Sequence, residues 1–194
     1  MVAALRQRVD AKSLTVAGIE SIPVHEDIKL GAPGGDAAIE AFSESLRAVG
    51  EAGVPVVCYN FMPVFDWLRS DLAKRRSDGS TALSYDEDTV LSMDPSVGEL
   101  ALPGWDSSYT KDGLRSLLAA YREVDAERLW DNLGYFLERV VPTAESLGVR
   151  LAIHPDDPPW PVFGLPRIVT GREALRRLTG LVDSPANGIT LCTG

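Results

Sequence analysis

Four short runs of apolar, largely β-branched residues recur along the chain, and helical patterns separate them. Runs of this length and composition are typical of strands that are buried on both faces. The sequence therefore predicts four strands, over residues 14–22, 54–61, 149–154 and 188–192. The third run must end at His154, because Pro155 has no N–H to donate to a neighbouring strand.

Four longer segments repeat apolar residues with the period of a helix. In the first, over residues 36–53, the apolar positions fall on one helical face: Ile39, Phe42, Leu46 and Val49. Asp36 is its expected N-cap and Gly53 its expected C-cap. The other segments are 112–126, 129–147 and 172–182. Since these helices alternate with strands too apolar to face water, the pattern predicts an α/β fold with a parallel sheet covered by helices.

One excursion interrupts this alternation. Residues 62–112 separate the second strand from the next helix, and they include the turn-like sequences DGS at 78–80 and PGW at 103–105. This stretch is too long for a simple connection between a strand and a helix. We expect a single domain over residues 1–194, in which residues 62–112 form a lid over the strand ends.

The composition restricts the classes of function. The chain has 194 residues, 45% of them hydrophobic and 24% charged, as is usual for a globular protein with a buried core. A formal net charge of −9 argues against nucleic acid or an anionic membrane as a partner. Two cysteines cannot supply a disulfide framework, and no run reaches the roughly 18 apolar residues of a membrane span. The first ten residues lack a signal-peptide core, so we expect a cytoplasmic protein that acts on a small molecule.

Polar side chains gather where the predicted strands stop. In parallel α/β folds the carboxyl ends of the strands line the site. From the first strand to the last, these ends supply Glu20 and His25, then Asn60 and Asp66, then His154, Asp156 and Asp157, and finally Cys192. Neighbouring strands lie about 5 Å apart, so His154 and Cys192 on successive strands could both reach one metal ion.

Simpler interpretations exist for the same residues. The loop after His154 contains five prolines, which suits a stiff binding loop but also a rigid connection with solvated aspartates. Cys192, like Cys58, could be a small buried apolar residue. His25 could make only a local turn contact.

The motifs at these positions resemble those of the mannonate dehydratases of hexuronate breakdown. The resemblance spans nearly the whole chain, in the family's order, through residues 20–31 (ESIPVHEDIKLG), 57–67 (VCYNFMPVFDW), 78–83 (DGSTAL), 154–167 (HPDDPPWPVFGLPR) and 184–194 (SPANGITLCTG). It implies a TIM-type (β/α) barrel of the xylose-isomerase-like kind. It also implies a divalent metal and the removal of water from D-mannonate to give 2-keto-3-deoxy-D-gluconate.

The resemblance assigns roles to particular residues. The family's metal ligands include a histidine and a cysteine that match His154 and Cys192. A thiolate ligand favours a transition metal over Mg²⁺, and we expect Mn²⁺ or Fe²⁺. The remaining ligands and the acid and base that move protons come from strands later in the family's sequence, beyond Gly194.

Further site residues are expected from chemistry. His25, Asn60, Asp66 and Arg69 are expected to contact the hydroxyl and carboxylate groups of the substrate, with Arg69 as a planar clamp on the carboxylate. Asp156 and Asp157 are expected to orient His154 by hydrogen bonding. A competing interpretation makes Asp66 and Arg69 an exposed pair on a helix over residues 66–72.

The family's barrel has a first βα unit and later strands that this sequence lacks. We therefore expect a partial barrel of about four parallel strands with covering helices, which is inactive alone and either forms a homo-oligomer or pairs with the missing barrel portion. Two alternatives stay open. One is a metal-dependent sugar isomerase or epimerase of the same barrel class, and the other is a non-catalytic subunit or remnant.

Overall fold

The computed structural model describes residues 2–95 and 109–192 and has a four-stranded parallel sheet at its centre. The strands lie in chain order: β1 (Ile19–Glu20), β2 (Val56–Tyr59), β5 (Arg150–Ile153) and β6 (Asn187–Ile189). The predicted parallel α/β sheet is thus confirmed. These four strands form an open sheet and do not close a barrel.

The strand ends are level with one another because of the register. Tyr59 pairs with Ile153, and Ile153 pairs with Ile189. The ladder continues for one residue, since His154 N donates to the Tyr59 carbonyl at 2.7 Å and Thr190 N donates to the Ile153 carbonyl at 2.8 Å. The residues that follow β2, β5 and β6 therefore start from the same edge of the sheet.

All four strands are shorter than predicted, and the differences at β1 and β6 bear on the site. β1 contains only Ile19 and Glu20, and the expected strand residue Leu14 is 62% exposed. β1 is an edge strand that pairs with β2 alone, so its residues before Ile19 have no partner in the sheet. β6 ends at Ile189, which leaves Cys192 in the chain beyond the strand rather than at its last position.

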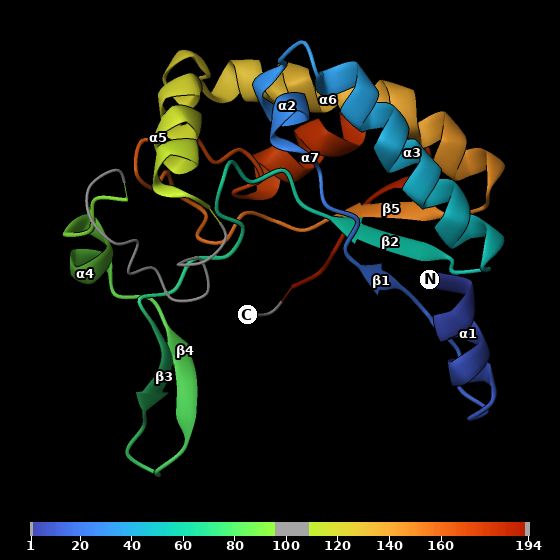
Figure 1. Ribbon diagram of the computed structural model, residues 1–194, viewed down its shortest axis with the longest axis horizontal. Coiled ribbons are helices and arrows are strands. Elements are labelled where there is room, and N and C mark those ends of the chain that lie inside the picture. The colour runs from blue at the N-terminus through green and yellow to red at the C-terminus, as the bar shows by residue number, and fades with distance from the viewer. Residues whose placement is uncertain (1, 96–108, 193–194) are drawn as a thin grey trace.

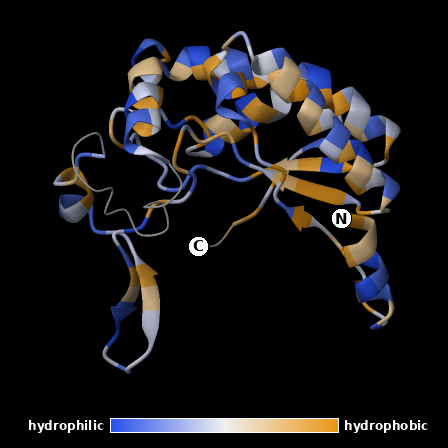
Figure 2. Ribbon diagram, viewed as in Figure 1, coloured by the Kyte–Doolittle hydropathy of each residue, from blue (hydrophilic) through white to orange (hydrophobic). Residues whose placement is uncertain are grey.

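The long helices cover one face of the sheet (Figure 1). They are α3 (Gly35–Glu51), α6 (Ala126–Ser146) and α7 (Arg172–Leu181), and the short α2 (Glu26–Leu30) lies before α3. Figure 2 shows orange strands beneath helices whose surfaces mix hydrophobic and hydrophilic residues. None of the described helices is both long and apolar enough to cross a membrane.

The caps of the helices differ in part from the prediction. Gly34, not Asp36, precedes α3, and it makes no side-chain capping bond. Asp36 lies inside the first turn and instead accepts a hydrogen bond from Tyr135 OH at 2.6 Å. The C-cap of α3 is Ala52 rather than Gly53, and Gly53 comes directly after it with a left-handed φ of 71°, a conformation that glycine adopts without strain.

The helix predicted over residues 112–126 is two elements. α5 (Lys111–Ala120) is followed by a 3₁₀ turn over Tyr121–Glu123. The chain then leaves the helical path because the Asp125 side chain caps α6 by accepting from Arg128 N at 2.8 Å. α6 thus begins three residues earlier than its apolar pattern predicted.

The excursion after β2 contains an antiparallel hairpin of β3 (Asp71–Arg75) and β4 (Thr81–Ser84), followed by α4 (Glu87–Leu91). In Figure 1 the hairpin projects from the body on the side opposite the helical layer, as does α1 (Val2–Asp10). Residues 66–70 are not helical, so the alternative of an exposed pair on a helix over 66–72 is wrong. Residues 96–108 of the predicted lid lie outside the described residues.

The core lies between the sheet and the helices. Phe136 on α6 is at its centre, with ring-centroid distances of 5.0 Å to Phe42, 5.7 Å to Tyr59 and 5.9 Å to Phe61. The four apolar residues predicted for one face of α3 are all buried. The opposite face of the sheet carries residues of intermediate exposure, such as Cys58 and Ala152, and no described helix covers it.

Candidate functional site

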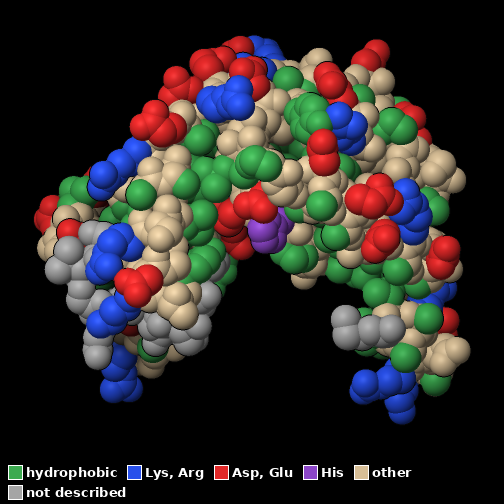
Figure 3. All heavy atoms as spheres, turned by 45° about the horizontal axis from the view of Figure 1, so that its top comes forward, with side chains coloured by type: hydrophobic (Ala, Val, Ile, Leu, Met, Phe, Trp, Pro, Cys, Tyr) green, Lys and Arg blue, Asp and Glu red, His purple; other side chains and the backbone are tan. Residues whose placement is uncertain are grey.

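A cavity of about 400 Å³ lies at the carboxyl ends of the strands. Six of the predicted site residues line it: Asn60, Asp66, Arg69, His154, Asp157 and Cys192. They come from the ends of β2, β5 and β6 and from the loops that follow. Figure 3 shows a histidine side chain next to acidic side chains where the surface is hollowed between its two projecting arms.

The strand pattern explains why Asn60 and His154 share this place. Tyr59 and Ile153 are paired and buried against the helices. Successive side chains of a strand point to opposite faces, and the ladder still includes the residue after Ile153. Asn60 and His154 are therefore directed away from the helical layer.

The imidazole of His154 is held by its own loop. Its Nδ1 lies 2.7 Å from the Pro155 carbonyl oxygen. A carbonyl can only accept, so between the two neutral tautomers this contact favours the one with the proton on Nδ1 and the lone pair on Nε2. This is the tautomer in which a histidine can bind a metal ion through Nε2.

Arg69 and Asp157 form a bidentate ion pair at the cavity wall. Arg69 Nη1 and Nη2 donate to Asp157 Oδ1 and Oδ2 at 2.9 and 2.7 Å, and the two side chains are 16% and 28% exposed. The hydrogen bond with Asp157 raises the pKa of Arg69, to which the charge of Cys192 also contributes. The predicted clamp thus holds a carboxylate of the chain itself.

Asp66 is largely buried beside this pair. Burial raises its pKa above the usual value for an aspartate, while the charge of Lys29 and a hydrogen bond with the Asn60 side chain act in the opposite direction. Asn60 and Asp66 are therefore in contact at the cavity. The burial makes Asp66 easier to protonate than a solvated aspartate.

Asp156 stabilises the loop rather than the imidazole. Its Oδ2 accepts from Ile168 N at 2.6 Å and from Val169 N at 3.0 Å, and burial raises its pKa. No described hydrogen bond joins Asp156 or Asp157 to His154, which differs from the predicted orienting role. The Pro155 carbonyl, rather than a carboxylate, contacts His154 Nδ1. Asp156 is bonded to the backbone of Ile168 and Val169, and Asp157 to Arg69.

His25 does not line the cavity. Its side chain is 65% exposed, and Nδ1 accepts from Asp27 N at 3.2 Å at the start of α2. This is the local turn contact that the sequence left open. Cys192 is exposed as well, so the alternative of a small buried residue does not hold for it.

The described residues do not form a complete metal site. Among residues 2–95 and 109–192, no three side chains of His, Cys, Asp or Glu are placed to hold one ion. His154 and Cys192 nevertheless line the same cavity, and they offer an imidazole nitrogen and a sulfur. This donor set suits a divalent transition metal that takes its other ligands from elsewhere.

The sequence reasoning missed several lining residues, among them Trp67 and Leu83. Trp67 lies in the loop after β2, and the Arg69 guanidinium is 5.9 Å from the centre of its ring. Leu83 comes from β4 of the hairpin. Only the folded hairpin brings Leu83 to the cavity, so no local sequence signal could have identified it.

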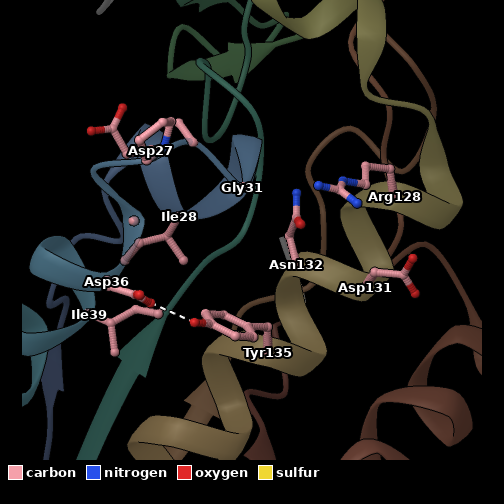
Figure 4. A pocket seen from close by; sticks show the side chains of 12 residues that line it. Asp27, Ile28, Gly31, Asp36, Ile39, Arg128, Asp131, Asn132 and Tyr135 are labelled. Atoms are coloured by element: carbon pink, nitrogen blue, oxygen red, sulfur yellow. Dashed lines mark hydrogen bonds between the residues drawn. The ribbon is translucent and has the colours of Figure 1, made fainter.

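A second cavity, of about 360 Å³, lies on the outer layer between α2, α3 and α6. Figure 4 shows Arg128, Asp131 and Asn132 of α6 across from Asp27 and Ile28. It shares no lining residue with the strand-end cavity. Its described lining residues carry charges of both signs, and none of them is one of the predicted site residues.

A parallel sheet with a polar cavity at the carboxyl ends of its strands defines an α/β protein of the kind that binds small molecules at this edge. The family model described as D-mannonate dehydratase (UxuA) matches residues 1–194. The chain therefore belongs to the D-mannonate dehydratase family.

Individual relatives agree with this family. A mannonate dehydratase of Streptococcus uberis is 54% identical over 190 residues, which are 98% of this chain and 55% of that protein. Mannonate dehydratase 2 of Halalkalibacterium halodurans is 52% identical over 191 residues, again 98% and 55% of the two chains. The crystal structure of mannonate dehydratase from Streptococcus suis serotype2 superposes with a TM-score of 0.89 at 49% identity, and covers 100% of this chain and 52% of that one. This chain spans about half the length of these relatives.

Proposed function

We propose that this chain contributes to the dehydration of D-mannonate to 2-dehydro-3-deoxy-D-gluconate and water, and that it does so as about half of a metal-dependent hydro-lyase. The observation that carries this proposal is the cavity shared by His154, Cys192, Asn60, Asp66 and Arg69. Family membership over the full chain supports it.

His154 and Cys192 are the proposed ligands of a divalent metal, Mn²⁺ or Fe²⁺. The contact of His154 Nδ1 with the Pro155 carbonyl favours the neutral tautomer with a lone pair on Nε2, which supports this role. When bound, the ion supplies a Lewis acid for the substrate carboxylate, which makes the neighbouring C2 proton easier to remove. The other metal ligands and the acid and base are proposed to lie in the half of the relatives that this chain does not match.

Substrate contacts are proposed for Asn60, Asp66 and Arg69, and from further away for His25. Asn60 and Asp66 offer hydrogen-bonding groups for sugar hydroxyls. Arg69 already pairs with Asp157, so a substrate carboxylate would bind its guanidinium in competition with that partner or at its free edge.

The sheet is proposed to be one wall of a TIM-type (β/α) barrel. The half-exposed residues on the face without helices, such as Cys58 and Ala152, would then point to the barrel interior. The whole protein is proposed to be cytoplasmic and homo-oligomeric, or to assemble by pairing of this chain with the rest of the barrel. The region of 62–112 is proposed as a lid on the cavity, because Trp67 and Leu83 line it.

A substrate panel tests the reaction. A chimera that joins this chain to the residues of the Streptococcus suis relative that it does not match is expected to convert D-mannonate to a 2-keto-3-deoxy acid. A sugar isomerase or epimerase of the same barrel class would instead act on ketoses without loss of water. The 194-residue chain alone is expected to retain little metal after dialysis and to be inactive, because its described residues place two proposed ligands at the cavity, fewer than a catalytic metal site normally has.

A further inference from the structure

The segment that carries Asn60 and Asp66 to the cavity is buried but is neither helix nor strand. Five of its apolar side chains are at most 2% exposed: Phe61, Met62, Val64, Phe65 and Leu68. Trp67, at the cavity, is 39% exposed. The backbone of residues 61–68 therefore needs hydrogen-bond partners that regular secondary structure does not provide. Val64 also has a φ of 61°, which is unfavourable for a β-branched residue. The surroundings must hold this conformation in place.

Side chains from distant parts of the chain bind this backbone. The four hydrogen bonds are Lys29 Nζ to the Met62 carbonyl at 2.8 Å, Val64 N to Glu26 Oε2 at 3.3 Å, Tyr109 OH to the Val64 carbonyl at 3.0 Å, and Arg167 Nη2 to the Phe65 carbonyl at 2.6 Å. Two of the four come from α2, although α2 itself does not line the cavity. The loop after β2 is thus held in place by residues that do not line the cavity.

Glu26 joins these supports. Its Oε1 accepts from Lys29 Nζ at 2.7 Å, and its Oε2 accepts from Tyr121 OH at 2.5 Å in addition to the Val64 amide. The side chains of Glu26 and Lys29 are 18% and 4% exposed, so water competes little for these charge-assisted bonds. One carboxylate connects α2, the 3₁₀ turn after α5 and the segment 61–68.

The same charges act on the cavity. Lys29 and Glu26 both interact electrostatically with Asp66, which hydrogen bonds with Asn60. A shift of the Met62–Val64 backbone would therefore change both the position and the electrostatic environment of Asp66. Glu26 lies outside the cavity wall and reaches it only through other residues.

We propose that Glu26 is a positioning residue of the candidate site, which fixes the segment 61–68 through Lys29, Tyr121 and the Val64 amide and so sets the arrangement of Asn60 and Asp66. This inference rests on the proposed function only in taking the strand-end cavity as the substrate site.

Amide hydrogen exchange of the 194-residue chain tests the first half of the proposal. Glu26→Gln keeps the size of the side chain but removes its charge. It is expected to speed exchange in residues 61–68 by about tenfold, the loss that follows when one buried charge-assisted bond is weakened. The exchange of β2 and β5 is expected to stay within about twofold of the parent chain, because these strands are held by their own ladder and by packing. Glu40→Gln is the matched control, since Glu40 is 63% exposed and pairs only with Arg47 at the surface.

Two outcomes would overturn this half. Exchange that rises equally in residues 61–68 and in β2 and β5 would show that Glu26 supports general stability alone, and unchanged exchange would show that it does not hold the segment. If Glu26→Gln does not fold, Tyr121→Phe decides the question, because it removes only the hydroxyl that donates a hydrogen bond to the Glu26 carboxylate. The expected local rise is then smaller but confined to the same residues.

Kinetics of the chimera test the second half. Glu26→Gln is expected to raise the KM for D-mannonate about tenfold and to leave kcat within about twofold, because the misplaced groups bind substrate and do not transfer protons. A local rise in exchange without any change in KM or kcat would refute the positioning role and leave the proposed function intact. A chimera that binds no mannonate would refute the proposed function, and the exchange data would then decide whether Glu26 holds the segment.

Discussion

The helix-covered face of the sheet and the cavity at the strand ends are built by different interactions. The covered face is held by apolar packing around Phe136, with aromatic neighbours on α3, β2 and the loop that follows. The cavity is held by ion pairs that are largely shielded from water: Arg69–Asp157 in its wall and Glu26–Lys29 outside the wall, against the segment 61–68. We therefore expect most of the stability to come from the apolar packing of the covered face, and the ion pairs at the cavity to contribute less while they fix the positions of polar groups.

The two regions also use different backbone. β2 and β5 carry the covered face on a regular ladder of four paired residues each. The cavity depends on loops after these strands, whose backbone is bound by side chains from α2 and from Arg167. Substitutions should therefore act on the two regions with different size, salt dependence and pH dependence.

The largest effect is expected in the apolar region. Phe136→Ala should lower the free energy of unfolding by about 3–5 kcal/mol, because it removes a fully buried ring that contacts three others. Urea unfolding measures this loss. Glu138→Ala on the exposed side of the same helix is the control and should change the value by less than about 0.5 kcal/mol. Equal losses for the two variants would contradict the location of the core.

A smaller effect is expected for the ion pair at the cavity. A double-mutant cycle on Arg69 and Asp157 should give a coupling of about 1–3 kcal/mol, since both side chains are mostly buried. The matched pair is Arg177–Glu127, which has two bonds of 2.7 Å but exposures of 40% and 71%. Its coupling should be below about 1 kcal/mol and should weaken further in salt. Similar couplings would show that burial does not distinguish the cavity from the surface.

The buried Asp66 and the exposed Asp78 should change the pH dependence of the free energy of unfolding in opposite directions. Burial raises the folded-state pKa of Asp66 above the value of 3.8 for an unperturbed group, so its contribution to stability is present at low pH and is lost as the pH rises through the folded pKa. Asp66→Asn should remove this loss, so the free energy of unfolding of the variant, relative to that of the parent chain, should increase from pH 3.5 to pH 7. Hydrogen bonds with Ser80 lower the pKa of the exposed Asp78, so Asp78→Asn should show the opposite trend. Urea unfolding across this pH range decides, and parallel trends for both variants would refute the account.

Local pattern predicted much of the fold because the signals lie within each element. The face of α3, the paired strands β2 and β5, and the end of the third strand before Pro155 all follow from residues close in sequence. The length of β1 was predicted less well, because it depends on having a partner on only one side.

The site was predictable in its members but not in its contacts. The strand-end rule brought Asn60, His154 and Cys192 to one cavity. The partners of Arg69 and Glu26 could not be predicted, since Asp157 is 88 residues from Arg69 and Tyr121 is 95 residues from Glu26. Such pairs depend on how loops pack in the folded chain, and neither composition nor residue spacing predicts that packing.

The most direct test of the central claim is the rate of 2-keto-3-deoxy acid formation from D-mannonate and Mn²⁺ by the chimera that completes this chain. His154→Ala and Cys192→Ser should each lower that rate by at least about 100-fold, with loss of bound Mn²⁺ in metal analysis. Cys58→Ser, a cysteine within β2 that is not a proposed ligand, should keep both the metal and most of the rate. Full activity and full metal content in His154→Ala or Cys192→Ser would contradict the assignment of the strand-end cavity as the metal-dependent site.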